Sequence, residues 1–315
     1  MYTAGVDLGG TNIVVGIVNE QNQIIGRAKM KTNSPRPAEQ IFADIAACFF
    51  QAAENAKVSL DDIKSVGVGT PGSVNKAAGV IDYANNLGFD KVPAREMLES
   101  MVKKPVYLEN DANCAALGEA VAGAGKGEKN FVAVTLGTGV GSGVIVDGKI
   151  ISGVNNAGGE IGHTVIGMDG ELCTCGRRGC WESYASARAL VQQTKDAMRK
   201  NQDSIMWDLV KGDLSAVNGR TSFDAMRAGD AAGKQVVEQY VYYVSVGISN
   251  IVNTFQPALV CVGGGISNEG ETLMVPLRKA VERERYSRYS ARQTELVAAE
   301  LANDAGIIGS ALLTE

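Results

Sequence analysis

The chain opens with three short runs of mostly apolar residues, separated by stretches of small and polar ones. The first separator is Gly9-Gly10-Thr11 and the second is Asn19–Asn22. Separators of this composition are typical of tight turns between neighbouring strands. The pattern therefore predicts a three-stranded meander over residues 2–8, 13–18 and 23–30.

Beyond this meander, the periodicity changes repeatedly between that of helices and that of strands. Ile41, Ile45 and Phe49 fall on one face of a helix predicted over residues 38–56. By the same reasoning we predict helices over 112–122, 182–200, 222–228 and 233–254, and buried strands over 66–69, 106–108 and 259–262. The fold class is therefore predicted to be α/β.

The run Val236–Asn253 could be mistaken for a membrane span, but it contains Glu238, Gln239 and Ser245. These polar residues predict a core helix. The sequence holds no apolar run of the ~18 residues that a span needs, and no charged-then-apolar leader. We therefore expect a cytoplasmic protein with no membrane partner.

The opening pattern is repeated later in the chain. Asp7-Leu8-Gly9-Gly10-Thr11 matches Thr135-Leu136-Gly137-Thr138-Gly139 at an offset of 128 residues, and Val18 matches Val146 at the same offset. Chance is the alternative for so short a match. A period far longer than the ~20–50 residues of solenoid repeats favours two duplicated domains.

Length and charge narrow the classes of protein further. At about 150 residues per domain, 315 residues suggest two domains. A net charge of -5 argues against a nucleic-acid partner. The only histidine is His163, which excludes mechanisms that need two histidines.

Glycine is unevenly spread along the chain. Of the 38 glycines, 16 lie in residues 123–179, where backbone turns or ligand contacts are expected.

Three glycine-rich turns could bind the phosphates of a nucleotide. Two of them are the related turns at residues 9–11 and 137–139, and the first follows the carboxylate of Asp7, a candidate metal ligand. The third, Gly263-Gly264-Gly265, follows a strand and precedes a predicted helix. Each alone is more often a plain turn. Their combination favours a phosphate site.

A polar triplet, Glu109-Asn110-Asp111, lies between the strand 106–108 and the helix 112–122. Asp111 could simply cap that helix. It also lies at the carboxyl end of a strand, where α/β sheets bind ligands, and could accept a proton from a substrate hydroxyl. Thr70-Pro71-Gly72 closes another strand and forms either a turn or part of the same rim.

Three of the six cysteines crowd together with the histidine, as His163, Cys173, Cys175 and Cys180. Three thiols and an imidazole are the ligands of a tetrahedral structural zinc site. The alternative is three buried free cysteines beside a surface histidine. Glu160 and Glu182 bracket this cluster, and they are either solvated surface residues or ligands for a polyol.

These motifs together resemble the ROK family of bacterial sugar kinases and repressors, most closely its glucokinase-like members. The resemblance covers nearly the whole chain. It implies two duplicated actin-like, ribonuclease-H-like domains with an interdomain cleft that binds sugar and ATP. The N-terminal domain is then expected over 1–119 plus 304–315, and the C-terminal domain, which carries the zinc loop, over 120–303. The resemblance also implies a homo-oligomer, a dimer or a tetramer.

The resemblance also implies roles for individual residues. Asp111 would be the general base for the 6-hydroxyl of the sugar, and Asp7 would orient Mg²⁺. Other sugar contacts would come from Gly72, Asn110, Glu160, His163 and Glu182, with His163 also a zinc ligand. ATP would be held through its phosphates and adenosine by Gly9, Gly10, Thr11, Gly137, Thr138, Gly139, Gly264 and Gly265.

The expected function is ATP-dependent phosphorylation of a hexose, with glucose first. Relatives commonly carry a tryptophan after Asn-Leu where this chain has Asn86-Leu87-Gly88-Phe89, so mannose, fructose and N-acetylmannosamine stay open, as does polyphosphate as donor. A second class is a sugar-sensing repressor. The resemblance implies that such repressors carry a DNA-binding segment ahead of the kinase-like part, and we expect the six residues before Asp7 to be too few for one. A third is an actin- or chaperone-like ATPase, against which the cysteine cluster argues.

Overall fold

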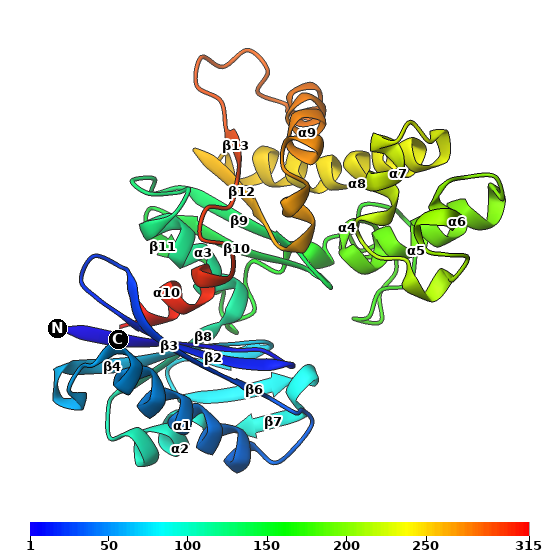
Figure 1. The fold of residues 1–315 in the computed structure, drawn as a ribbon. Helices are drawn as coiled ribbons and strands as arrows, with labels where there is room; N and C mark the ends of the chain where they lie inside the picture. Colours follow the sequence, from blue (N-terminus) through cyan, green and yellow to red (C-terminus); the bar gives the residue numbers. More distant parts are fainter. Residues whose placement is uncertain (315) are drawn as a thin grey trace. The chain divides into compact units, whose positions relative to one another are not determined.

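The computed structural model describes residues 1–314, which form two compact units. The first unit comprises Met1–Ala133, Gly143–Gly159 and the chain from Glu300 onward, and the second comprises Val134–Ser142 and Glu160–Ala299. Both units are α/β (Figure 1). The duplication boundaries expected at residues 119 and 303 stay a prediction.

The first unit is built on a five-stranded sheet in the order β3-β2-β1-β4-β8. The strands β1, β2 and β3 are antiparallel neighbours, whereas β4 and β8 run parallel to β1. The predicted meander is therefore confirmed. Their bounds are Tyr2–Leu8 for β1, Asn12–Val18 for β2, Ile24–Lys31 for β3, Ile63–Thr70 for β4 and Val106–Asn110 for β8.

Helix α1 (Ala38–Ala56) packs on β2 and β3, and α10 (Ala305–Ala311) packs on β1 and β4 together with α3 (Asp111–Ala122) (Figure 1). Helix α10 lies so close to β1 and β4 that only glycine fits on the strands where they face its backbone. A Cβ on Gly5 would lie 1.9 Å from the carbonyl oxygen of Ile307, and one on Gly67 would lie 1.8 Å from that of Ser310. These glycines therefore serve packing and not ligand binding.

The second five-stranded sheet has the order β11-β10-β9-β12-β13, which repeats the order of the first. Strand β10 (Val140–Val146) corresponds to β2 at the predicted offset of 128 residues. This confirms the duplicated α/β fold. The other bounds are Phe131–Leu136 for β9, Lys149–Ile150 for β11, Leu259–Gly263 for β12 and Glu295–Ala298 for β13.

A third, small sheet in the order β5-β6-β7 belongs to the first unit and was not predicted. Its strands are too short to show a periodicity, because they have only three to five residues each. They cover Ser73–Asn75, Val80–Ala84 and Phe89–Val92, and α2 (Ala94–Val102) follows.

The second unit carries the long helix α8 (Ala231–Phe255), which extends the predicted helix 233–254 slightly at both ends. The helix predicted over 182–200 is in fact two helices, because the side chain of Ser186 accepts a hydrogen bond from Ala189 N and starts a new one. The helices besides α8 are α4 (Glu182–Ala185), α5 (Ala187–Lys200), α6 (Met206–Leu209), α7 (Thr221–Arg227) and α9 (Glu271–Glu284). Single 3₁₀ turns cover Leu60–Asp62, Asn85–Leu87, Ile161–His163, Leu214–Ala216, Gly265–Glu269 and Ala302–Asp304.

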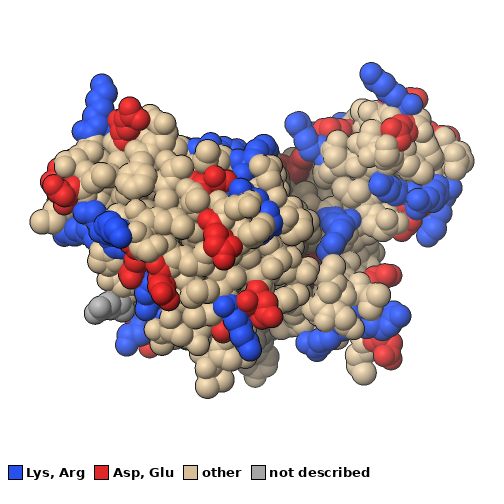
Figure 2. Space-filling model, turned by 90° about the horizontal axis from the view of Figure 1, so that it is seen from below, with Lys and Arg blue, Asp and Glu red and all other residues tan. Residues whose placement is uncertain are grey.

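Surface charge is mixed on the face shown in Figure 2. Lysine and arginine side chains lie there among aspartate, glutamate and uncharged residues, without a gathering of one sign. Among the described residues, no helix is both long and apolar enough to cross a membrane.

Candidate functional site

The carboxyl ends of the parallel strands bring the predicted acidic residues together in the first unit. In the sheet, Asp7 of β1 is opposite Gly69 of β4, which is opposite Glu109 of β8. Asp111 follows two residues later, as the first residue of α3. The negative charge of Asp111 is close enough to act on Asp7. The two carboxylates that the sequence singled out therefore form a pair.

Both carboxylates are poorly solvated. Burial raises the pKa of Asp7 to about 6, and the charge of Asp111 adds to the effect. Burial also raises the pKa of Asp111, although hydrogen bonds from the backbone N–H groups of Ala112 and Asp111 itself oppose the shift. A carboxylate with a raised pKa is a better proton acceptor than a solvated one.

Asn110, and not Asp111, caps helix α3. Its Oδ1 accepts hydrogen bonds from Ala112 N at 2.9 Å and Asn113 N at 3.3 Å. Its Nδ2 donates to the carbonyl oxygen of Gly72 at 3.1 Å. The N-cap of α3 is therefore Asn110, although Asp111 Oδ1 also accepts a hydrogen bond from Ala112 N at 2.8 Å. Gly72 and Asn110, both predicted site residues, lie in contact.

The support that Glu109 and Lys76 give this turn was not predicted from the sequence. Glu109 is buried, with a side chain only 2% exposed, and it forms an ion pair with Lys76. Lys76 also donates to Ser152 Oγ at 2.7 Å. A lysine between two short strands carries no sequence signal of such a role, because most lysines in turns are solvated.

The predicted phosphate turns form as expected from their sequences. In the first turn, Gly9 N donates to Asn12 O at 2.9 Å, and Thr32 Oγ1 donates to Gly9 O at 2.6 Å. In the second, Gly137 N donates to Gly139 O at 3.0 Å. These bonds close each turn.

The third glycine run lies directly beside the second turn within the second unit. Gly264 has a φ of +86°, and a Cβ there would lie 2.5 Å from the carbonyl oxygen of Leu136. Only glycine satisfies both constraints. Gly137 and Gly265 have open space where a Cβ would be. The backbone on both segments is therefore accessible to a bound molecule.

The side chains of His163, Cys173, Cys175 and Cys180 converge, with their candidate ligand atoms all within 4.8 Å of one another. Cys175 Sγ and Cys180 Sγ are 3.7 Å apart, and Cys173 Sγ is 3.6 Å from His163 Nδ1. A tetrahedral zinc with bonds of about 2.3 Å to sulfur and about 2.05 Å to nitrogen would require about 3.8 Å and about 3.6 Å. The cluster fits such an ion.

The pKa values of Cys173 and Cys180 are shifted in opposite directions. Burial raises the pKa of Cys173, yet hydrogen bonds with Cys175, Ser183 and His163 outweigh it and lower that pKa to about 7. Burial and the neighbouring thiols raise the pKa of Cys180 to about 12. A cluster that stabilises a thiolate provides the form of cysteine that binds metal.

The loop that carries the cluster is anchored by Trp181. This residue is fully buried, and its Nε1 donates to Tyr243 O at 2.9 Å on α8. A Cβ on Gly247 of the same helix would lie 2.0 Å from the Trp181 ring. The loop around the cluster is otherwise irregular, with two isolated bridges, Val165 to Cys180 and Leu172 to Arg178.

The glutamates that bracket the cluster differ in their surroundings. Glu182 Oε2 accepts from Val140 N at 3.1 Å, and its Oε1 accepts from Thr174 Oγ1 at 3.1 Å, so this carboxylate connects the second glycine turn with the cysteine loop. Glu160 is exposed and immediately precedes the 3₁₀ turn that carries His163. The two predicted sugar ligands therefore lie at opposite ends of the loop's sequence.

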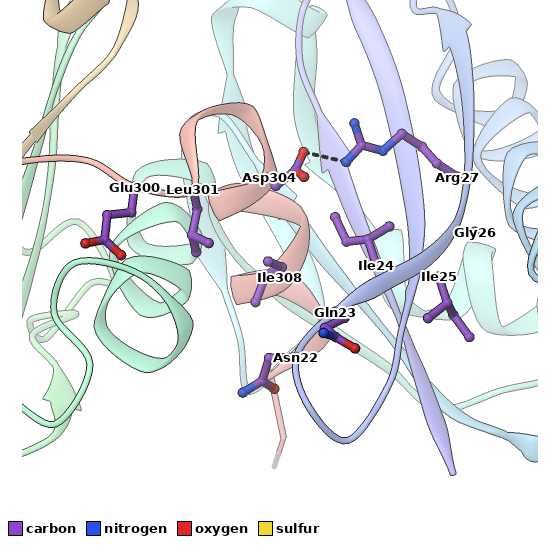
Figure 3. A pocket seen from close by; sticks show the side chains of 10 residues that line it. All are labelled: Asn22, Gln23, Ile24, Ile25, Gly26, Arg27, Glu300, Leu301, Asp304 and Ile308. Atoms are coloured by element: carbon purple, nitrogen blue, oxygen red, sulfur yellow. Dashed lines mark hydrogen bonds and ion pairs between the residues drawn. The ribbon is translucent and has the colours of Figure 1, made fainter. Parts of the chain in front are cut away.

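A groove lies elsewhere in the first unit. It has a volume of about 510 Å³, and Arg27 pairs with Asp304 across it (Figure 3). It contains none of the site residues predicted from the sequence. Its lining residues are Asn22, Gln23, Ile24, Ile25, Gly26, Arg27, Glu300, Leu301, Asp304 and Ile308.

Replacing Asp7 with asparagine is expected to stabilise the protein at pH 8 but not at pH 4. The folded-state pKa of about 6 exceeds the ordinary 3.8, so burial of the charged form costs stability above pH 6. This cost fades as the pH falls from 6 to 3.8 and is absent below. The expected gain at pH 8 is about 2–3 kcal/mol. Urea unfolding at both pH values measures it, and an equal change at both would contradict a raised pKa.

Known proteins are similar to this chain over nearly its whole length. A family model described as "ROK family" matches residues 3–315. The chain is 37% identical to a glucokinase of Halalkalibacterium halodurans, an alignment that covers 100% of this chain and 95% of that protein.

Two solved structures are similar over nearly the full length. A ROK family glucokinase from Streptomyces griseus, in complex with glucose and AMPPNP, has a TM-score of 0.84 at 34% identity and covers 99% of this chain and 98% of its own. A ROK hexokinase from Thermus thermophilus has a TM-score of 0.82 at 33% identity, with 99% and 97% covered.

Proposed function

The chain belongs to the ROK family, and from this premise we propose that it transfers the γ-phosphoryl group of ATP to the 6-hydroxyl of glucose. The observation that carries the proposal is the half-buried pair of Asp7 and Asp111 at the carboxyl edge of the first sheet. A pair of carboxylates with different roles, one for a proton and one for a metal, suits phosphoryl transfer.

Asp111 is the general base. Its carboxylate takes the proton of the 6-hydroxyl as that oxygen bonds to the γ-phosphorus and the bond to the ADP oxygen breaks. Because Asn110 caps the helix, Asp111 is held at the start of α3 without having to cap it itself. Most of the catalysis then comes from positioning and charge stabilisation.

Asp7 suits a bound Mg²⁺, because a hard cation prefers oxygen ligands and would relieve the cost of its buried charge. With the nucleotide bound, Mg²⁺ neutralises charge on the phosphates. The phosphates are held by the backbone of Gly9, Gly10, Thr11, Gly137, Thr138 and Gly139. The adenosine lies near Gly264 and Gly265, whose position beside Leu136 supports a shared nucleotide site.

The cluster of His163 and three cysteines would hold a structural zinc ion. Four protein ligands leave no open coordination position, which argues against a catalytic zinc. His163 Nδ1 faces Cys173, so the other ring nitrogen can hydrogen-bond to a sugar hydroxyl. The ion would hold the irregular loop, and with it the sugar contacts of Glu160, His163 and Glu182.

The remaining sugar contacts come from the first unit. Asn110 and the backbone of Gly72 are candidates, and their mutual hydrogen bond fixes both before a sugar binds. Pre-organised polar groups lower the entropic cost of binding. A cytoplasmic location and a homo-oligomer, dimer or tetramer, stay predictions.

Glucose is expected to be the preferred acceptor and ATP the donor. A coupled assay of ADP release, run with glucose, mannose, fructose and N-acetylmannosamine, is expected to give the highest kcat/KM for glucose. Discrimination of at least about tenfold is expected, because a lost or misplaced hydroxyl leaves a polar group of the site unpaired. Polyphosphate in place of ATP serves as the donor test. A higher kcat/KM for another sugar would reassign the substrate.

The repressor alternative is disfavoured by the same carboxylate pair. A protein that only senses sugar needs hydroxyl ligands but no general base. Sugar binding without any ADP release, in the presence of MgATP, would favour that alternative.

A further inference from the structure

A lysine in the turn after β5 reaches the end of β8, next to the candidate base. The Lys76 ammonium forms an ion pair with Glu109 Oε2 and donates to Ser152 Oγ at 2.7 Å. Its side chain is 36% exposed, whereas that of Glu109 is 2% exposed. One side chain thus joins three segments of the first unit: the β5–β6 turn, the end of β8 and the chain after β11.

The side chain of Glu109 forms hydrogen bonds to the turn that carries Asp111. Its Oε1 accepts from Asn110 N at 2.9 Å and from Asn113 Nδ2 at 3.1 Å, while Oε2 faces Lys76. Asn110 and Asn113 lie on either side of Asp111 in the sequence. A buried carboxylate in this position sets the backbone from which Asp111 projects.

The charge of Glu109 requires a partner. An ionised carboxylate without a cation is strongly disfavoured in a buried position, and removing one member of such a pair is far more costly than removing both. The Lys76–Glu109 pair therefore differs from an exposed surface pair, which contributes little. The ammonium of Lys76 is the cation that the structure provides.

The position of Lys76 is itself fixed. Arg95 donates from Nη2 to Lys76 O at 2.6 Å and from Nε to Val106 O at 3.1 Å, so it ties the β5–β6 turn to the start of β8. The hydrogen bond of Asn110 Nδ2 with Gly72 O ties the same segment to the end of β8. These hydrogen bonds therefore fix the turn that carries Lys76.

The second partner of Lys76 lies at the base of a loop. Gly158 N donates to Ser152 O at 2.8 Å, which closes the loop between them. In the sequence this loop leads directly to Glu160 and His163, the candidate sugar ligands. Lys76 thus contacts the residue at which that loop begins. It also supports the turn that carries Asp111, the candidate general base.

We propose that Lys76 is a positioning residue for phosphoryl transfer, which neutralises the buried Glu109 and through it holds the Asn110–Asp111 turn in the reactive position. The inference rests on the proposed function, since it names a residue that supports the same site. Lys76 acts through Glu109, so its loss affects turnover more than nucleotide binding.

The test compares Lys76→Met, Glu109→Gln and the double variant, with Lys64→Met, at an exposed lysine of β4, as the matched control. We expect kcat with glucose and MgATP to fall at least about tenfold in K76M, because small misplacements of reacting groups are costly, while KM for ATP changes less than about twofold. The double variant carries no unpaired buried charge and is expected to turn over faster than K76M. K64M is expected to match the wild type.

A folded K76M with a kcat within twofold of the wild type would overturn the proposal, and so would a double variant no faster than K76M. If K76M does not fold, the double variant decides. In that case a double variant that folds and phosphorylates glucose supports the role, because the unpaired charge of Glu109 is then what K76M does not tolerate, and a double variant that also fails to fold overturns it. An inactive wild type would instead overturn the proposed function, which separates the two failures.

Discussion

Replacing Asp111 with asparagine is expected to lower kcat at least about 100-fold while glucose still binds. The substitution keeps the shape of the side chain but removes the group that takes the hydroxyl proton, and general-base catalysis contributes about 10²–10⁴-fold. Asparagine can keep the hydrogen bond from Ala112 N, which Asp111 Oδ1 accepts at 2.8 Å. The start of α3 should therefore stay intact, as Asn110 caps it.

Steady-state kinetics and glucose titration calorimetry measure the two halves of this prediction. Asp90→Asn, at an exposed aspartate of β7 in the same unit, is the matched control and is expected to leave kcat unchanged. Turnover by D111N within a few-fold of the wild type would remove Asp111 from the role of base.

Replacing Cys175 with alanine is expected to abolish zinc binding and glucose phosphorylation together. Cys175 is the exposed member of the cluster, so its loss opens no cavity in the core. Metal contributes about 10 kcal/mol or more to small structural zinc sites. The loop between His163 and Trp181 contains only turns and two isolated bridges, so without metal it should lose much of its structure.

Metal analysis is expected to find about one zinc per chain in the wild type and close to none in C175A. Cys48→Ala, which removes a thiol from the core of the first unit, is the control and should retain the metal. A fully active protein purified without zinc would show that the cluster needs none.

Features encoded by short stretches of sequence were predictable. The first meander, α1 and the turn at residues 137–139 follow from local periodicity and from glycine, which act over a few residues. The cluster of His163 with the three cysteines was predicted for a similar reason, because few other environments suit a Cys-x-Cys pair with two nearby ligands. Local chemistry was enough for these features.

Features that depend on contacts between distant segments were not predictable. Turns or ligand contacts were expected for the glycines of residues 123–179, and no role was predicted for Gly5 and Gly67. These two serve the close approach of α10, which is more than 200 residues away in sequence. Helix packing of this kind has no signature in the residues around each glycine.

Glu119 shows the same limit. This glutamate is 3% exposed, and it accepts hydrogen bonds from the backbone N–H groups of Ala124, Glu300 and Leu301. In the sequence it is a charged residue on a helix, for which a solvated face is the usual interpretation. Only the fold brings residues 300 and 301 to it.

The central claim, phosphoryl transfer from ATP to the 6-hydroxyl of glucose, is tested most directly by identifying the product. The protein, glucose and MgATP are mixed, and glucose 6-phosphate is measured through a dehydrogenase specific for that ester. Glucose 6-phosphate is expected in equal amount to ADP, with none when sugar or ATP is omitted. Release of ADP without glucose 6-phosphate, or no turnover in a zinc-loaded protein, would contradict it.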